Sequence, residues 1–126
     1  MQLRISNRSF GQAGVLDCDG RIVFGDETAL LHHAVKDMFT ENKTVVLNLK
    51  NVHYIDSSGV GELVGLFTSA RKAGGRMVLA GLTQRVRDVL QITKLAMVFE
   101  IYDSVEEAAE SFKQKAGKAT PAEYAG

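Results

Sequence analysis

Residues 44–82 read TVVLNLKNVHYIDSSGVGELVGLFTSARKAGGRMVLAGL, and this stretch decides the fold. Its first six residues form a compact, β-branched run that is typical of a buried central strand. A segment of helical length follows over 58–73, and the pair Gly74-Gly75 stands where helices commonly end. RMVLAGL (76–82) is predicted to be the next strand. A strand, a helix and a strand in this order predict a right-handed crossover between parallel strands.

The same alternation extends toward both ends of the chain. Upstream we expect a strand over 2–10, a second strand over 15–24 interrupted near Gly20, and a helix over 26–40 capped by Asp26. Downstream, hydrophobic spacing and cap residues predict three further elements: a helix after Thr83, a strand over 98–102 and a helix from Ser104.

The resulting order is β-β-α-β-α-β-α-β-α. It predicts an α/β fold with a mixed, mostly parallel sheet of about five strands and about four helices. The first strand is expected to pair antiparallel with the second, and helices should cover one side of the sheet, or mostly one side. In such sheets, function gathers where loops leave the carboxyl ends of strands. YIDSSG (54–59) is one of those loops.

Composition limits the classes of function. The chain has 126 residues, 45% hydrophobic and 24% charged, which fits one globular domain, here assigned to 1–116. We expect a flexible tail over 117–126, which contains the single proline. Fifteen basic residues balance fifteen acidic ones, which argues against a nucleic-acid partner. The single Cys18 is expected to be a small buried strand residue. No apolar run is long enough for a membrane span or a signal peptide, so we expect a cytoplasmic protein.

The loop YIDSSG allows three interpretations: a helix cap, a catalytic nucleophile, or a serine that another protein modifies. Serine hydrolases place G-x-S-x-G at such a turn and a histidine later in the chain. Here that glycine spacing is absent, and the histidines, His32, His33 and His53, all precede the loop. No cluster of acids and histidines has metal-ligand spacing, and no phosphate loop is present. We therefore expect no enzyme activity, metal or cofactor.

The helix after the loop has an unusual outward face. Val60, Leu63, Val64 and Phe67 gather on the side expected to face the sheet. The opposite side collects small and polar residues, with Leu66 at its margin: Ser58, Gly61, Glu62, Gly65, Ser69 and Lys72. Glycine in a helix costs about 0.5–1 kcal/mol relative to alanine. A flat glycine face beside exposed serines favours close approach by another protein, although tight packing would also explain it.

The chain resembles the STAS domain family, and specifically the anti-sigma factor antagonists, over about residues 3–113. The most specific match is D-S-[ST]-G-[VL]-G at Asp56–Gly61. The glycine pair before the next strand and the L-x-x-T-x-L of Leu90–Leu95 follow in the expected order. The resemblance implies that a partner serine kinase, which is also the anti-sigma factor, phosphorylates Ser57, with Ser58 as the neighbouring cap. The unphosphorylated protein would bind the anti-sigma factor and release a sigma factor, and a phosphatase would reset it. The implied partner surface is Asp56, Ser58, Gly59, Gly61, Glu62 and Gly65.

The sequence departs from the family pattern in one place. Relatives of this type often carry G-E-[LIV]-D after the second strand, but Gly20 is followed here by Arg21, Ile22 and Val23. Some STAS domains are instead subunits of ABC-type lipid transporters, in which this hydroxyl need not be modified. A response-regulator receiver, phosphorylated on Asp56, fits poorly because it needs an acidic pair after its first strand and a lysine after its last.

Overall fold

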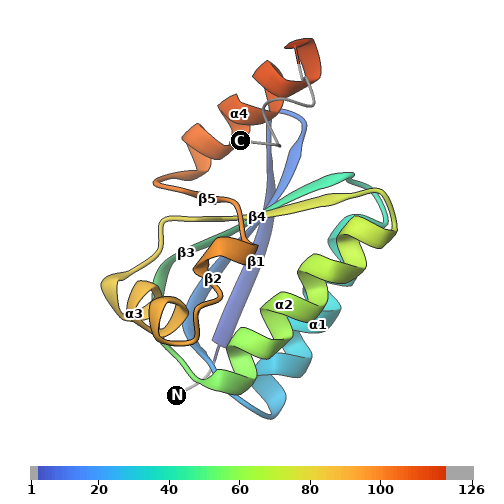
Figure 1. Ribbon diagram of the computed structural model, residues 1–126. Coiled ribbons are helices and arrows are strands. Elements are labelled where there is room, and N and C mark those ends of the chain that lie inside the picture. Colours follow the sequence, from blue (N-terminus) through green and yellow to red (C-terminus); the bar gives the residue numbers. More distant parts are fainter. Residues whose placement is uncertain (1–2, 119–126) are drawn as a thin grey trace.

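The computed structural model describes residues 3–118, and side chains through Phe112. Five strands form one sheet in the order β1-β2-β3-β4-β5 (Figure 1). Strand β1 pairs antiparallel with β2, and the remaining neighbours are parallel. The mixed, mostly parallel sheet predicted from the sequence is thereby confirmed. The strands are β1 (Leu3–Phe10), β2 (Ala13–Ile22), β3 (Thr44–Ile55), β4 (Arg76–Ala80) and β5 (Ile101–Tyr102).

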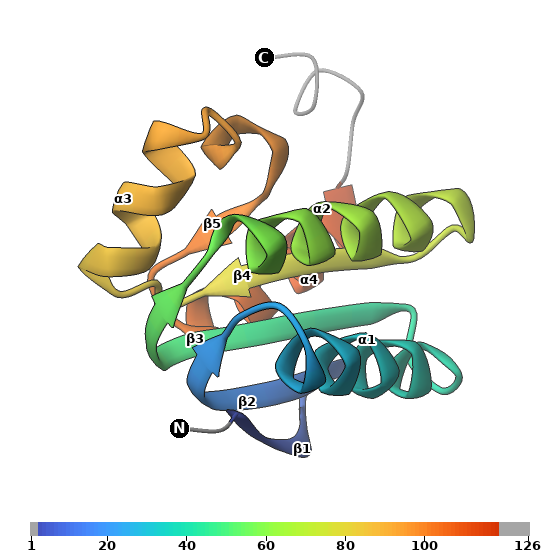
Figure 2. The same cartoon turned by 90° about the horizontal axis from the view of Figure 1, so that it is seen from below.

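Four α-helices cover the sheet unequally. Three of them lie on one face and α4 lies on the other, as Figure 2 shows when the molecule is seen from below. The helices are α1 (Asp26–Phe39), α2 (Ser57–Lys72), α3 (Gln84–Ile92) and α4 (Val105–Lys118), with a short 3₁₀ turn, η1 (Ala96–Val98). The expectation of helices mostly on one side is confirmed.

The core has a large and a small part. The large part fills the space between the sheet and α1, α2 and α3, with buried side chains such as Ile22, Leu47 and Leu63. The small part lies under α4, where Val105 and Ala108 pack on Val46 and Val78. Because β3 and β4 carry apolar side chains toward both layers, residues 45–49 and 77–80 are almost entirely apolar.

Strand β3 is longer than predicted. It continues from the apolar run to Ile55, whereas the sequence indicated an end near residue 49. Lys50 and Asn51 are both exposed, and Leu49 and Val52 both lie in the large core. The β2–β3 register shifts in this region. At this irregularity, buried and exposed residues no longer alternate with a period of two, which is the pattern that predicts a strand from sequence.

Two other boundaries were wrong. Of the predicted strand over 98–102, only Ile101 and Tyr102 are assigned to a strand. Val98 ends the 3₁₀ turn, and the Phe99 ring packs edge-to-face on Phe67 with the ring centroids 5.6 Å apart. Helix α1 is capped by Gly25 rather than Asp26, which is already helical.

Helix α4 continues through Lys118, so residues 117–118 of the predicted tail belong to this helix. The rest of the predicted tail, residues 119–126, lies outside the described residues.

The end of α2 and the start of α4 follow the predicted chemistry. Helix α2 ends with Gly74 at φ 84°, and the N–H groups of Gly74 and Gly75 donate to the carbonyls of Arg71 and Ala70. This pair of hydrogen bonds closes the helix in a Schellman motif. The Ser104 hydroxyl accepts from the N–H of Glu107 at 3.1 Å, as expected of a cap of α4.

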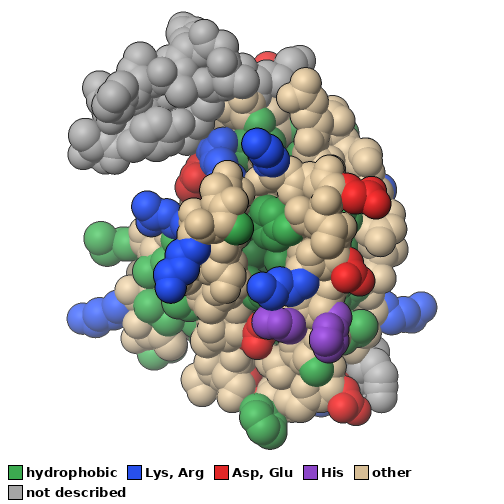
Figure 3. Space-filling model, turned by 90° about the vertical axis from the view of Figure 1, so that its right-hand side faces the viewer, with side chains coloured by type: hydrophobic (Ala, Val, Ile, Leu, Met, Phe, Trp, Pro, Cys, Tyr) green, Lys and Arg blue, Asp and Glu red, His purple; other side chains and the backbone are tan. Residues whose placement is uncertain are grey.

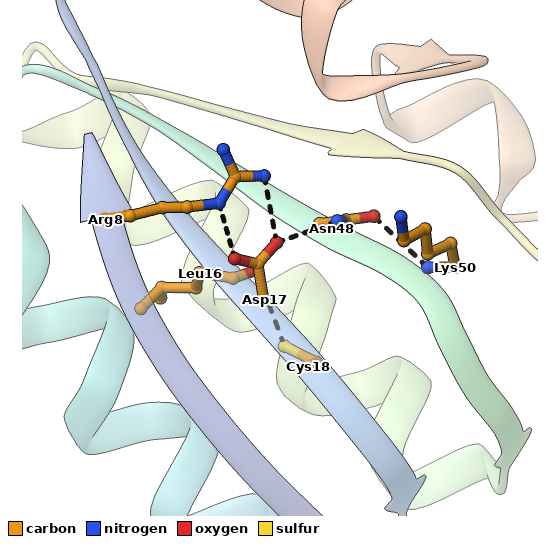
Figure 4. Close-up of polar contacts among 6 residues, drawn as sticks. All are labelled: Arg8, Leu16, Asp17, Cys18, Asn48 and Lys50. Carbon is orange, nitrogen blue, oxygen red and sulfur yellow. Dashed lines mark hydrogen bonds and ion pairs between the residues drawn. The ribbon is translucent and has the colours of Figure 1, made fainter. Parts of the chain in front are cut away.

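A polar cluster lies on the α4 side of the sheet (Figure 4). Arg8 donates from Nε and Nη2 to the Asp17 carboxylate at 2.6 and 3.2 Å, and Asn48 Nδ2 donates to the same carboxylate at 2.8 Å. The hydrogen bond from Arg8 holds the pKa of Asp17 below its usual range. The neighbouring Cys18 faces the other way, and its burial raises the pKa of the thiol to about 12. The expectation that Cys18 is a buried strand residue is confirmed.

Candidate functional site

The candidate site is the turn that joins β3 to α2, at the carboxyl edge of the parallel strands. Asp56 has an extended backbone and caps α2, since its Oδ1 accepts from the N–H of Gly59 at 2.8 Å. Its Oδ2 accepts from the N–H of Phe24 at 3.2 Å, in the turn between β2 and α1. The Asp56 carboxylate therefore ties together two loops that are distant in the sequence.

Gly59 is a packing residue and is not part of an outer surface. A Cβ at this position would lie 2.3 Å from the carbonyl oxygen of Ile22 and 2.7 Å from Cγ1 of Ile55. The same Ile22 carbonyl accepts from the N–H of Asp56 at 3.3 Å. Only glycine lets the first turn of α2 lie this close to the end of β2. Gly59, which the sequence analysis included in the partner surface, is buried in the described structure.

Ser57 and Ser58 are the first two residues of α2, and both are exposed. Within residues 3–118, neither hydroxyl takes part in a hydrogen bond. From the residues alone, either Asp56 or Ser58 could cap α2. The structure uses Asp56, so the role of cap that the resemblance implied for Ser58 is wrong. The N-terminal end of a helix carries a partial positive charge and unpaired N–H groups, which favour an anion such as a phosphoryl group. Both serines lie at this end of the helix, and no hydrogen bond among the described residues uses their hydroxyls.

The outward face of α2 is flat where the sequence indicated. Gly61 and Gly65 are exposed, and a Cβ on either would meet nothing within 4 Å. No packing contact in the described structure therefore requires these two glycines. Leu66 is buried, so it belongs to the core and not to the margin of this face.

Glu62 is less available than predicted. Its side chain is largely covered, and its Oε2 lies 2.8 Å from Nδ1 of His32 on α1. His32 and His33 sit at the surface of α1, as expected, with their rings 5.8 Å apart. A partner that contacts Glu62 would therefore also meet His32.

Phe24 belongs to this region, although the sequence reading placed it inside the second strand. Strand β2 ends at Ile22, and the Phe24 side chain is 79% exposed beside Asp56. The signal for this turn was Gly25, whose φ of 115° is readily adopted only by glycine.

A hollow lies at the other end of the same helix pair (Figure 3). It has a volume of about 320 Å³ between the carboxyl-terminal halves of α1 and α2, with Val35, Phe39 and Leu66 in its lining. The basic residues Lys36 and Lys43 also line it, and none of the predicted site residues does. Among the described residues, no group of histidine, cysteine or acidic side chains could hold a metal ion. None of the described helices is long and apolar enough to cross a membrane.

Comparison with known proteins identifies the family. The family model described as "STAS domain" matches residues 4–108. This chain therefore belongs to the STAS domain family, and its five-stranded α/β sheet is the fold of that family.

Two proteins with similar sequences carry related names. A Thermotoga neapolitana protein provisionally named an anti-sigma factor antagonist is 38% identical over 66 residues, which is 52% of this chain and 58% of that protein. The anti-sigma-B factor antagonist of Listeria monocytogenes is 40% identical over 55 residues, 44% of this chain and 48% of that protein. The matched stretches thus span about half the length of these relatives.

Comparison with solved structures covers more of the chain than these sequence matches do. A crystal structure of a Thermotoga maritima protein, also provisionally named an anti-sigma factor antagonist, superposes with a TM-score of 0.76 at 25% identity. The superposition covers 85% of this chain and 92% of that one.

Proposed function

We propose that this chain is an anti-sigma factor antagonist whose binding is switched by phosphorylation of Ser57. In the unmodified state it binds an anti-sigma factor that is also a serine kinase, and so frees a sigma factor. Phosphorylation of Ser57 ends that binding, and a phosphatase restores it. The chain itself then acts as a binding protein and not as an enzyme.

The main support for this proposal is that the residues of D-S-S-G differ in what they do for the fold. Asp56 makes the cap and Gly59 allows the close packing, so both are accounted for by the fold. The two serines between them are exposed and make no hydrogen bond within the described residues. A hydroxyl that the fold does not use, at a helix end that favours an anion, is suited to modification.

The charge of a phosphoryl group explains how the switch works. It adds about −1.5 to −2 charges, which the helix end stabilises by about 0.3–1 kcal/mol. The free protein should therefore accept it with little change of fold. A partner surface shaped for a neutral hydroxyl would have to bury a dianion without a cation, at a cost of several kcal/mol. Since 1.4 kcal/mol is a factor of ten, affinity should fall by orders of magnitude.

The test is phosphorylation by purified kinases. Each serine kinase of the anti-sigma factor class in the source genome is incubated with the chain and ATP, and the product is mapped by mass spectrometry. We expect phosphate on Ser57, none in Ser57→Ala, and normal labelling of Ser58→Ala. Phosphate on Ser58 with none on Ser57 would contradict the assignment. No phosphate with any kinase would favour the transporter-subunit alternative.

The flat face of α2 gives a second test. Gly65→Leu should fold normally and bind the kinase poorly, because the added side chain keeps the partner from the helix. Gly65→Ala is the matched control and should bind almost as well as the original chain. Normal binding by Gly65→Leu would place the interface elsewhere.

A further inference from the structure

We propose that Phe24 is the anchor residue of the surface with which this chain binds its partner. The Asp56 carboxylate fixes the position of the Phe24 backbone relative to Ser57. This inference rests on the proposed function and adds to it a specific contact with the partner. The partner would be a folded protein with an apolar pocket for the Phe24 ring beside the cleft that receives the Ser57 hydroxyl.

The first observation is an aromatic side chain that the fold leaves in solvent. The Phe24 side chain is 79% exposed, and it takes no part in either hydrophobic core. A large apolar side chain beside a candidate binding site is the type of residue that dominates the energy of protein interfaces. Its removal should affect binding more than folding.

The second observation is that the backbone around this ring is fixed. The N–H of Phe24 donates to Asp56, and the N–H of Gly25 donates to Oγ1 of Thr28 at 3.2 Å. The Gly25 carbonyl accepts from the Thr28 hydroxyl at 2.9 Å and from the N–H of Ala29 at 3.1 Å. The turn therefore holds the backbone at Phe24 in one conformation, and little backbone entropy remains to be lost when a partner binds.

The charges around the ring indicate the chemistry of the partner. Asp26 and Glu27 lie in the first turn of α1, directly after Phe24 in the chain, and the Asp56 carboxylate accepts from the Phe24 N–H. The rim of the partner's pocket should therefore carry lysine or arginine. Complementary charges of this kind speed the encounter and fix the orientation of a complex.

The hydrogen bond to Asp56 also links Phe24 to the state of Ser57. A phosphoryl group on Ser57 would stand next to the Asp56 carboxylate and compete for the same helix-end N–H groups. Of the two hydrogen bonds that the Asp56 carboxylate accepts within the described residues, the bond from Phe24 is the longer, at 3.2 Å against 2.8 Å. Repulsion between the two anions should break that bond first. Phosphorylation would then release the anchor as well as add charge.

The binding test uses the kinase that labels Ser57 in the experiment above. We expect Phe24→Ala to raise the Kd by about 30-fold or more, the effect of an interface hot spot. Phe24→Tyr, which keeps the ring, should stay within about threefold of the original affinity. Ile92→Ala removes an equally exposed apolar side chain on α3 and should leave the Kd unchanged. An unchanged Kd for Phe24→Ala, or an equal loss for Ile92→Ala, would overturn the proposal.

A second measurement needs no partner and tests the link to Ser57. Phosphoserine is incorporated at position 57 during translation, and the amide signals of the isolated chain are compared by NMR. The Phe24 amide proton should move upfield as its hydrogen bond to the carboxylate is lost, while the strand amides stay in place. An unmoved Phe24 signal would overturn the coupling. If no kinase labels Ser57, the proposed function fails, and this measurement still decides the coupling.

Discussion

The β3–α2 and β4–α3 junctions stand at the same edge of the sheet and use hydroxyl residues differently. Thr83 caps α3: its Oγ1 accepts from the N–H of Val86 at 3.3 Å and donates to the carbonyl of Val52 at 2.8 Å. The hydroxyls of Ser57 and Ser58 make no hydrogen bond within the described residues, because a carboxylate caps their helix. A hydroxyl at a strand-to-helix turn therefore indicates function only where another group does the capping.

The largest expected effect separates two glycines of the β3–α2 junction. Gly59→Ala should lower the free energy of unfolding by about 1–3 kcal/mol, because the new Cβ meets a backbone carbonyl that cannot move aside cheaply. Gly61→Ala is the matched control in the same helix and should raise it by about 0.5–1 kcal/mol. Urea unfolding of both variants measures the difference. Equal effects would contradict the division into a packing glycine and a surface glycine.

The two caps can be compared directly. Asp56→Ala and Thr83→Ala should each lower the free energy of unfolding by about 0.5–2 kcal/mol, since each helix loses its side-chain acceptor. Thr83→Ser keeps the hydroxyl and serves as the control for loss of the methyl group. Thermal unfolding measures all three. No loss of stability in Asp56→Ala would mean that a serine takes over the cap, and the contrast between the two junctions would disappear.

The Asp17 carboxylate is hydrogen-bonded within the fold, and its contribution to the free energy of unfolding depends on pH. Its pKa is lowered in the folded state by Arg8, so its stabilisation is present above the unfolded value of about 3.9 and is lost as pH falls through the folded value. Asp17→Asn should cost about 0.2–1 kcal/mol at pH 7 and progressively less in acid. Asp103→Asn, at a carboxylate 81% exposed, is the control. A difference that grows in acid would have the wrong sign.

The smallest expected effect concerns the serines. Ser57→Ala and Ser58→Ala should change the free energy of unfolding by less than about 0.5 kcal/mol, as at exposed sites without partners. Calorimetry at neutral pH measures both, with Thr83→Ala as the contrasting hydroxyl deletion. A loss above about 1 kcal/mol in either serine variant would show that the fold uses that hydroxyl after all.

Sequence reading was reliable where one local rule decided the structure. The apolar runs of β3 and β4, the glycine pair that ends α2 and the cap at Thr83 were all predicted correctly. It failed where a distant contact decided, as at Phe99, which leaves the sheet to meet Phe67. It also placed Phe24 in a strand, because the Asp56 carboxylate that accepts from the Phe24 N–H lies on another loop, distant in the sequence.

The sequence by itself determined the α/β order, the family and the exposed serines after β3, because spacing and motif are local properties of the chain. Only the tertiary structure separated the roles within D-S-S-G. Gly59 is needed because the end of β2 lies against the first turn of α2, and Asp56 serves two loops because the parallel pairing of β2 and β3 brings those loops together. Close approach between segments far apart in the chain leaves no periodic pattern, so glycines of the same helix look alike until their neighbours are known.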